Sequence, residues 1–232
     1  MKMEQNAKPV NYQKMMDSVL EEISAGKSRP KLLLHACCGP CSTYVIEYLS
    51  KYFDITVYFY NPNIHPRMEY DKRLESMKKF VTEFPEAVKN QVRFVEEIYD
   101  AEDYFSATKV LEETDLQTEG ERGERCRRCY EFRMKKSWDY AEKNGFDYFT
   151  TTISISPCKD AKKINEIGLA LKSDKGVKYL VADFKKRNGF LRSLQLSKEY
   201  GLYRQTYCGC VYSMQNQRTC EKSEEHQCVF AL

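Results

Sequence analysis

The stretch Lys31-Leu32-Leu33-Leu34-His35-Ala36-Cys37-Cys38-Gly39-Pro40-Cys41 is the pattern around which the rest of the chain is organised. Its apolar run 32–34, bounded by Pro30 and by the Gly-Pro pair, predicts a short buried strand. Ser42-Thr43 and the apolar residues after them predict the start of a helix. Three cysteines therefore lie in a strand-to-helix turn. In an open α/β sheet this turn lies at the carboxyl edge, where ligands bind and helix amide groups favour anions such as thiolates.

Further apolar runs follow at the spacing of a repeated strand-helix unit. We expect an amphipathic helix over 11–27 and, after the first strand, four more strands over 55–60, 92–95, 148–153 and 177–181. Helices are expected between them, including 66–85, 104–111, 161–171 and 191–200. Five strands alternating with helices predict a single α/β domain with a doubly wound, mainly parallel sheet. We divide the chain into an N-terminal helical extension (1–30), a catalytic α/β domain (31–210) and a cysteine-containing C-terminal tail (211–232).

Composition limits the class of protein. A chain of 232 residues with 42% hydrophobic content can bury one large core. No run of eighteen apolar residues and no signal-peptide pattern is present, which predicts a cytoplasmic protein without membrane contact. The net charge is +3, but basic residues outnumber acidic ones in 119–136 and 185–204. Each cluster is a solvated helix face or a surface for an anionic partner such as RNA.

The ten cysteines are the most informative part of the composition, because structural disulfides are rare in a reducing cytosol. Seven fall into three tight clusters: Cys37, Cys38 and Cys41; Cys126 and Cys129; Cys208 and Cys210. The topology predicts that all three clusters meet over one edge of the sheet.

Three interpretations of these cysteines are open. Cys38 and Cys41 form a C-x-x-C pair typical of thioredoxin-like dithiol exchange, but that chemistry needs neither of the other clusters. The two later clusters have the spacing of a four-sulfur zinc site, as in a zinc-dependent RNA-binding protein. Seven thiols also divide into four for an iron–sulfur cubane and three for a neighbouring metal with an open position, which a catalytic metal needs.

The remaining cysteines and the histidines carry weaker signals. Cys158, at the end of a predicted strand, is as readily a buried apolar cysteine as a ligand. Cys220, His226 and Cys228 lie in the polar tail and leave a further metal site open as a minor alternative. We expect His35 to be packed or hydrogen-bonded beneath the cysteines.

Motifs along most of the chain carry a specific resemblance. They are Cys37-Cys38-Gly39-Pro40-Cys41, the segment from Tyr60 to Pro66 with Glu69-Tyr70 and Arg73, Cys126-x-x-Cys129, Thr151-Thr152 to Ser156-Pro157, and Phe190-Leu191-Arg192-Ser193 to Tyr207-Cys208-Gly209-Cys210. From about Lys31 to Cys210 the chain resembles the cobalamin-independent epoxyqueuosine reductases of the QueH type. The resemblance implies a HUP-like fold and reduction of the epoxide of epoxyqueuosine, at the wobble position of certain tRNAs, to queuosine.

The resemblance also implies cofactors and roles for particular residues. It implies a [4Fe-4S] cluster on Cys38, Cys126, Cys129 and Cys210. It implies a mononuclear metal, iron or zinc, on Cys37, Cys41 and Cys208, with Cys208 and Cys210 interchangeable between the two sites. Electrons would come from a low-potential donor of the ferredoxin or flavodoxin type, and the proton donor would be Tyr60, Tyr70 or water. Substrate contacts are expected from Asn61, Asn63, His65, Arg73 and Arg192, and tRNA phosphate contacts from Arg127 and Arg128.

Overall fold

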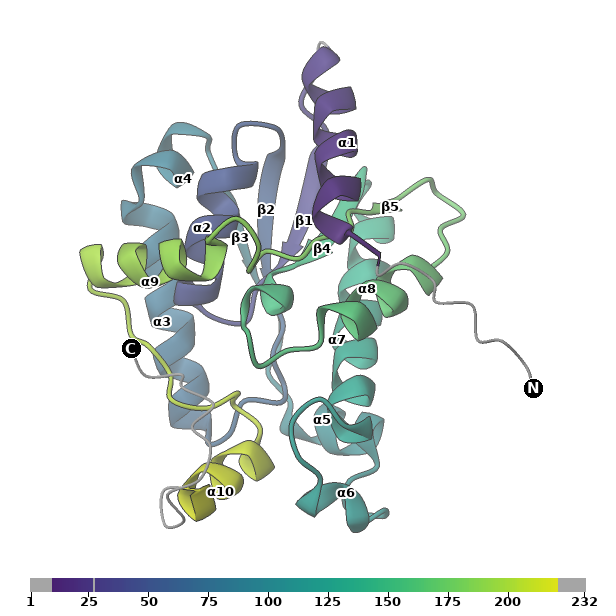
Figure 1. Ribbon diagram of the computed structural model, residues 1–232, viewed down its shortest axis with the longest axis vertical. Coiled ribbons are helices and arrows are strands. Elements are labelled where there is room, and N and C mark those ends of the chain that lie inside the picture. Colours follow the sequence, from purple (N-terminus) through teal and green to yellow (C-terminus); the bar gives the residue numbers. More distant parts are fainter. Residues whose placement is uncertain (1–9, 27, 221–232) are drawn as a thin grey trace, which may run out of the picture.

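A parallel five-stranded sheet forms the centre of the protein, with helices on both faces (Figure 1). The computed structural model describes residues 10–26 and 28–220, with side chains described up to residue 215. The strands lie in the order β3-β2-β1-β4-β5, and every neighbouring pair is parallel. Their bounds are β1 (Lys31–His35), β2 (Asp54–Phe59), β3 (Arg93–Glu96), β4 (Tyr148–Thr151) and β5 (Lys178–Tyr179). The predicted doubly wound α/β fold is confirmed.

The two faces of the sheet bury different helices. Leu32 and Leu34 of β1 join one apolar core and Leu33 joins the other, because successive strand residues point to opposite faces. The first core includes residues of α1 (Tyr12–Ala25), α2 (Gly39–Leu49), α3 (Arg67–Glu83), α4 (Pro85–Lys89) and α9 (Gly189–Glu199). The second includes residues of α7 (Glu124–Lys143) and α8 (Ala161–Ala170), and α5 (Ala101–Thr108) and α6 (Asp115–Thr118) lie against α7.

The strand order reverses at β1, which lies between β2 and β4. In doubly wound sheets the crevice outside the carboxyl ends of strands at such a reversal is where ligands bind. Here β1 runs into the Cys37-Cys38 turn, and β4 runs into a short 3-10 helix, η1 (Thr152–Ile155). The helix α10 (Val211–Cys220) and helices α5 and α6 lie at this same end of the molecule, in the lower part of Figure 1.

Several element boundaries differ from the sequence prediction. The helix α2 begins at Gly39 rather than at Ser42, because Pro40 suits a first helical turn and Cys38 caps it. The strand β5 is only two residues long, and α4, α6 and α10 were not predicted. Met16 and Leu20 of α1 join the first core. Among the described residues, no helix is both long and apolar enough to cross a membrane.

Candidate metal centre

Three thiols converge in the turn after β1. Cys38 is in extended conformation as the N-cap of α2, and its Sγ accepts from the backbone N–H of Cys41 at 3.4 Å. The Sγ atoms of Cys37, Cys38 and Cys41 all lie within 4.8 Å of one another, with Cys37 and Cys38 3.8 Å apart. Two sulfurs on one tetrahedral ion, each at about 2.3 Å from it, lie about 3.8 Å from one another. These three thiols therefore have a spacing at which they can share one metal ion.

The three thiols of this turn, Cys37, Cys38 and Cys41, differ in pKa. Hydrogen bonds from Cys38 and Cys41 hold the pKa of Cys37 well below its usual range, assisted by Arg133 and Thr152. Burial raises the pKa of Cys38 to about 12, and hydrogen bonding to Cys37 raises that of Cys41 well above its usual value. The trio thus favours one thiolate, and a metal would displace the remaining protons as it binds.

The other four clustered cysteines form a second group. Cys126 and Cys129 lie near the start of α7, Cys208 and Cys210 lie just before α10, and Cys129 packs in one apolar cluster with Cys210 and Tyr104. Burial, together with negative charge on Cys208, Cys126 and Cys210, raises the pKa of Cys129 to about 12 despite the nearby charge of Arg133. The Tyr104 hydroxyl lies 3.1 Å from Cys210 Sγ. Four sulfurs from two distant segments therefore lie close enough to affect one another's ionisation.

A buried arginine holds the Cys208–Cys210 segment in place. Arg73 on α3 donates from Nη1 to the carbonyl of Cys208 at 3.0 Å and from Nη2 to that of Tyr207 at 3.1 Å. Its Nε donates to Glu69 at 2.7 Å, and the other Glu69 oxygen accepts from the Tyr203 hydroxyl at 2.7 Å. Arg73 is only 1% exposed. Its described hydrogen bonds support the cysteine loop, and its expected contact with substrate remains a prediction.

Gly209 allows the loop to pass close to this arginine. Its φ of +112° is a conformation that side chains disfavour, and a Cβ there would lie 2.9 Å from Ile64 Cγ1 and 3.1 Å from Arg73 Nη1. The carbonyl of Gly209 accepts from the backbone N–H of His65 at 2.8 Å. The loop after β2 thereby supports the last cysteine pair.

Polar atoms without a partner among the described residues occur around the cysteines. Gln205 Nε2 lies 3.1 Å from Cys38 Sγ and 3.8 Å from Cys41 Sγ, while its buried Oε1 has no hydrogen-bond partner in the described part of the chain. The same is true of the Tyr130 hydroxyl, whose pKa is raised by burial and by the charge of neighbouring cysteines. Buried polar groups are normally satisfied, so such atoms indicate a place for a ligand, an ion or water.

The residues expected to contact substrate are mostly engaged inside the protein. Asn61 Nδ2 donates to the carbonyl of Ala36 at 2.8 Å, and Asn63 Oδ1 accepts from Arg133 at 2.6 Å. Both asparagines are fully buried. His65 packs against two aromatic rings of α5, and burial lowers its pKa. Their roles toward a substrate remain predictions.

The two candidate proton donors lie on different faces of the sheet. The Tyr60 hydroxyl donates to Asp103 at 2.8 Å; burial and this bond raise its pKa. Tyr70 belongs to the first core, opposite the α7 face, and burial raises its pKa to about 12. His35 is buried with Nδ1 2.8 Å from Thr151 Oγ1 and Nε2 3.1 Å from the carbonyl of Tyr60, which confirms a hydrogen-bonded histidine beneath the cysteines.

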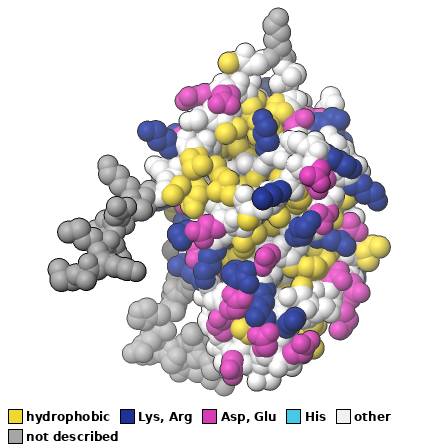
Figure 2. Space-filling view, turned by 90° about the vertical axis from the view of Figure 1, so that its right-hand side faces the viewer, with side chains coloured by type: hydrophobic (Ala, Val, Ile, Leu, Met, Phe, Trp, Pro, Cys, Tyr) yellow, Lys and Arg dark blue, Asp and Glu magenta, His cyan; other side chains and the backbone are white. Residues whose placement is uncertain are grey.

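The arginines expected to contact substrate or tRNA are ion-paired. Arg127 bonds Glu124 and Glu131, each at 2.7 Å, and Arg128 bonds Glu113 at 2.9 Å. Arg192 pairs with Glu47 at 2.5 Å. Figure 2 views the molecule from the α7 and α8 side, where acidic and basic side chains are intermixed. Contacts of these arginines with phosphate remain a prediction.

Cys158 differs from its sequence interpretation as a buried apolar thiol. It is 3% exposed, as expected, but it is disulfide-bonded. The expectation that structural disulfides are absent is therefore wrong for this cysteine. The side chain of Cys220, together with His226 and Cys228, lies outside the described residues.

Comparison with known proteins identifies the family. A model of the family described as epoxyqueuosine reductase QueH matches residues 32–216. The chain belongs to this family. The QueH protein of Streptococcus pyogenes serotype M1 is 43% identical over 208 residues, which cover 90% of this chain and 80% of that protein. The QueH proteins of Staphylococcus epidermidis and Thermotoga maritima are 39% and 36% identical and are covered over 86% and 92% of their lengths.

Membership of the QueH family confirms the resemblance drawn from the cysteine motifs. The structure places near the cysteines several polar residues that the sequence analysis did not select, namely Gln205, Tyr104, Arg133, Lys159 and Glu121. Gln205 stands three residues before Cys208, so its nearness to the last motif was a usable signal. The others are single polar residues in helices or loops, and their sequence context gave no sign of their positions.

Proposed function

We propose that the protein reduces the epoxide of epoxyqueuosine in tRNA to the alkene of queuosine, at a metal centre held by its seven clustered cysteines. Membership of the QueH family and similarity to the epoxyqueuosine reductases of other bacteria support the activity. The observation that carries the proposal is that the thiols form two groups: Cys37, Cys38 and Cys41 within 4.8 Å of one another after β1, and Cys126, Cys129, Cys208 and Cys210 near enough for their charges to interact. The turn after β1 lies at the carboxyl edge of the sheet, where a doubly wound fold binds its ligand.

The donor set fits the implied metals. Thiolates select iron–sulfur clusters and zinc over hard cations, and every residue of the seven is a cysteine. We assign Cys38, Cys126, Cys129 and Cys210 to a [4Fe-4S] cluster and Cys37, Cys41 and Cys208 to a mononuclear metal, iron or zinc. The Sγ atoms of Cys37, Cys38 and Cys41 lie within 4.8 Å of one another, which supports metal binding at this turn. At that distance Cys38 can serve as a ligand of the cluster or of the mononuclear metal.

The reaction sets requirements that the chain's residues have to meet. Loss of the epoxide oxygen breaks two C–O bonds and forms one C=C bond, and it consumes two electrons and two protons as the oxygen leaves in water. When bound, a cluster would supply electrons one at a time, and a second metal would polarise the epoxide oxygen. Cys37, the thiol with the lowered pKa, is ready to act as a ligand. Tyr60 and Tyr70 stay candidates for the proton donor.

The partners follow from this reaction. The substrate is a tRNA, so we place the protein in the cytoplasm, and we assign the electrons to a low-potential donor of the ferredoxin or flavodoxin type. Asn61, Asn63, His65, Arg73 and Arg192 are the proposed substrate contacts, and Arg127 and Arg128 the proposed phosphate contacts. The ion pairs of the last two and of Arg192 would have to open or be shared for a phosphate to bind.

Metal and sulfide analysis of protein purified without oxygen tests the proposal. We expect about four acid-labile sulfides and at least four irons per chain, together with conversion of epoxyqueuosine in tRNA, followed by mass spectrometry of the nucleosides. Cys126→Ala should lose the cluster and the activity, whereas Lys162→Met, at an exposed lysine that pairs with Glu166, should keep both. Zinc without sulfide would instead favour a zinc-dependent RNA-binding protein. Activity that survives iron chelation would favour dithiol exchange by Cys38 and Cys41.

A further inference from the structure

A buried lysine lies beside the second group of cysteines. Lys159 follows η1 at the carboxyl end of β4 and is only 8% exposed. Its Nζ forms an ion pair with Glu121 at 2.9 Å, and the side chain of Glu121 is itself 22% exposed. An ammonium group loses much hydration energy on burial and remains charged there only where negative groups compensate it. The surroundings of Lys159 therefore have to supply negative charge.

Two of the surrounding groups are cysteines of the second group. Burial by itself lowers the pKa of Lys159, but negative charge on Cys208, Tyr130, Glu121 and Cys126 outweighs burial and raises it well above its usual value. Lys159 is thus close enough to Cys126 and Cys208 for its charge to interact with theirs.

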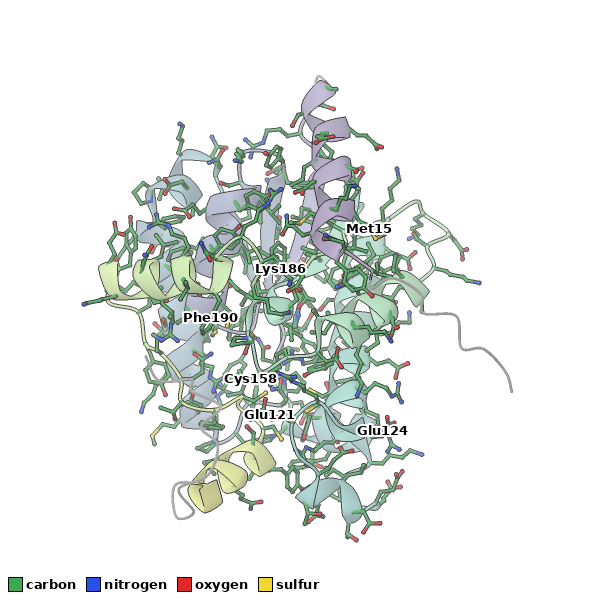
Figure 3. All side chains as sticks on the ribbon, viewed as in Figure 1. Met15, Glu121, Glu124, Cys158, Lys186 and Phe190 are labelled. Carbon is green, nitrogen blue, oxygen red and sulfur yellow. The ribbon has the colours of Figure 1, made fainter. Side chains whose placement is uncertain are left out.

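Hydrogen bonds connect this ion pair to the Cys208 backbone. The second oxygen of Glu121 accepts from Ser213 Oγ at 2.9 Å, and Ser213 Oγ accepts from the backbone N–H of Cys208 at 3.3 Å. The labelled Glu121 and Cys158 lie close together in Figure 3, and the Lys159–Glu121 ion pair joins their two segments. These contacts therefore fix the position of Lys159 relative to the loop that carries Cys208 and Cys210.

We propose that Lys159 is a positioning residue that sets the charge of the Cys126, Cys129, Cys208 and Cys210 group, and so the reduction potential of the metal held there. The inference rests on the proposed function, because it concerns the iron–sulfur cluster assigned to these thiolates. Adding an electron makes such a group more negative, and a nearby positive charge stabilises the reduced form. Net charge and hydrogen bonds at the sulfurs are the factors that set cluster potentials.

Glu121 gives the inference a test of sign. It carries the opposite charge at the same place, because its carboxylate joins Lys159 Nζ to Ser213 Oγ, which accepts from the backbone N–H of Cys208. Removing the lysine charge should shift the cluster potential to more negative values, and removing the glutamate charge should shift it to more positive values. A purely structural ion pair predicts no such opposition, since breaking it from either side disturbs the same contact.

The experiment compares midpoint potentials of the anaerobically purified full chain, followed by the EPR signal of the reduced cluster. We expect Lys159→Met to shift the potential negatively, Glu121→Gln to shift it positively, and Lys159→Arg to stay near the unsubstituted protein. Lys162→Met is the matched control, because Lys162 is an exposed lysine with its own glutamate partner at 2.8 Å. It should leave the potential unchanged.

Each outcome decides between the proposals. Shifts of the same sign in Lys159→Met and Glu121→Gln, or no shift larger than that of Lys162→Met, overturn the role of Lys159 while the cluster and the proposed function stand. Absence of any cluster signal in the unsubstituted protein overturns the proposed function and this inference together. If Lys159→Met fails to load metal, the other two variants still decide, because the proposal requires a positive shift in Glu121→Gln and no shift in Lys159→Arg.

Discussion

Replacement of Arg73 by methionine should destabilise the protein strongly through the loop that carries Cys208 and Cys210. The substitution removes three buried hydrogen bonds, to Glu69, Tyr207 and Cys208, and leaves the carboxylate of Glu69 only 7% exposed and without its cation. Breaking a buried ion pair from one side costs about 3–5 kcal/mol. For a chain of this size that is a fall in melting temperature of roughly 10 °C.

The same helix offers a matched control. Arg67 pairs with Asp71 at 2.8 Å with the same four-residue spacing, but their side chains are 60% and 48% exposed. Exposed pairs contribute about 0–1 kcal/mol, so Arg67→Met should barely change the melting temperature. Arg73→Lys should recover little of the loss, because an ammonium lacks the planar fork that reaches two carbonyls and a carboxylate at once.

Two measurements check this reasoning. Thermal unfolding followed by far-ultraviolet circular dichroism on metal-free protein measures the loss of stability. Iron and sulfide content after anaerobic reconstitution at a temperature where the variant is folded measures the effect on the cysteine loop. We expect Arg73→Met to lose both stability and metal. Equal melting temperatures for Arg73→Met and Arg67→Met, or full metal content in folded Arg73→Met, would refute the role given to this arginine.

Two further substitutions probe the same loop. Gly209→Ala should cost about 1–3 kcal/mol and lower the metal content, because its φ of +112° and its approach to Ile64 and Arg73 exclude a Cβ; unchanged unfolding and iron content would contradict this. Tyr104→Phe should leave the fold intact, at a cost of about 1 kcal/mol. It should shift the reduction potential of the cluster to more negative values, because it removes the hydroxyl 3.1 Å from Cys210 Sγ. A redox titration followed by EPR measures the potential, and an unchanged value would show that Tyr104 does not donate a hydrogen bond to Cys210.

The sequence predicted the architecture well wherever hydrophobic periodicity was strong. The strands β1 and β2 and the helices α3 and α8 lie within a few residues of their expected positions, because continuous apolar runs and helical spacing specify buried elements. The early start of α2 was missed because it depends on capping by Cys38 and on Pro40, which the apolar pattern does not report. The short helices α4 and α6 have too few residues to produce a periodic signal.

The sequence predicted which cysteines cluster, but it did not predict the hydrogen bonds that hold them in place. The first trio is local in sequence, and the strand-to-helix turn fixes it. The contact between Arg73 and the carbonyl of Cys208 joins residues 135 positions apart, and backbone carbonyls carry no sequence signal. Asn61 and Asn63 were expected to contact substrate because they follow a strand, yet their described bonds hold the turn to Ala36 and to Arg133.

The two groups of cysteines differ in what holds them in place. Cys37, Cys38 and Cys41 belong to one turn, which depends on the buried central strand β1 and on the helix α2 that follows it. Cys208 and Cys210 reach the centre only when α3, the loop after β2 and the Glu121 network hold their loop, so their positions are sensitive to distant substitutions. Metal bound by thiols of both groups would in turn stabilise that loop, because binding free energy at an assembled site is also folding free energy. The second group is therefore where loss of metal and loss of structure should coincide, and the first is where thiol geometry should persist without metal.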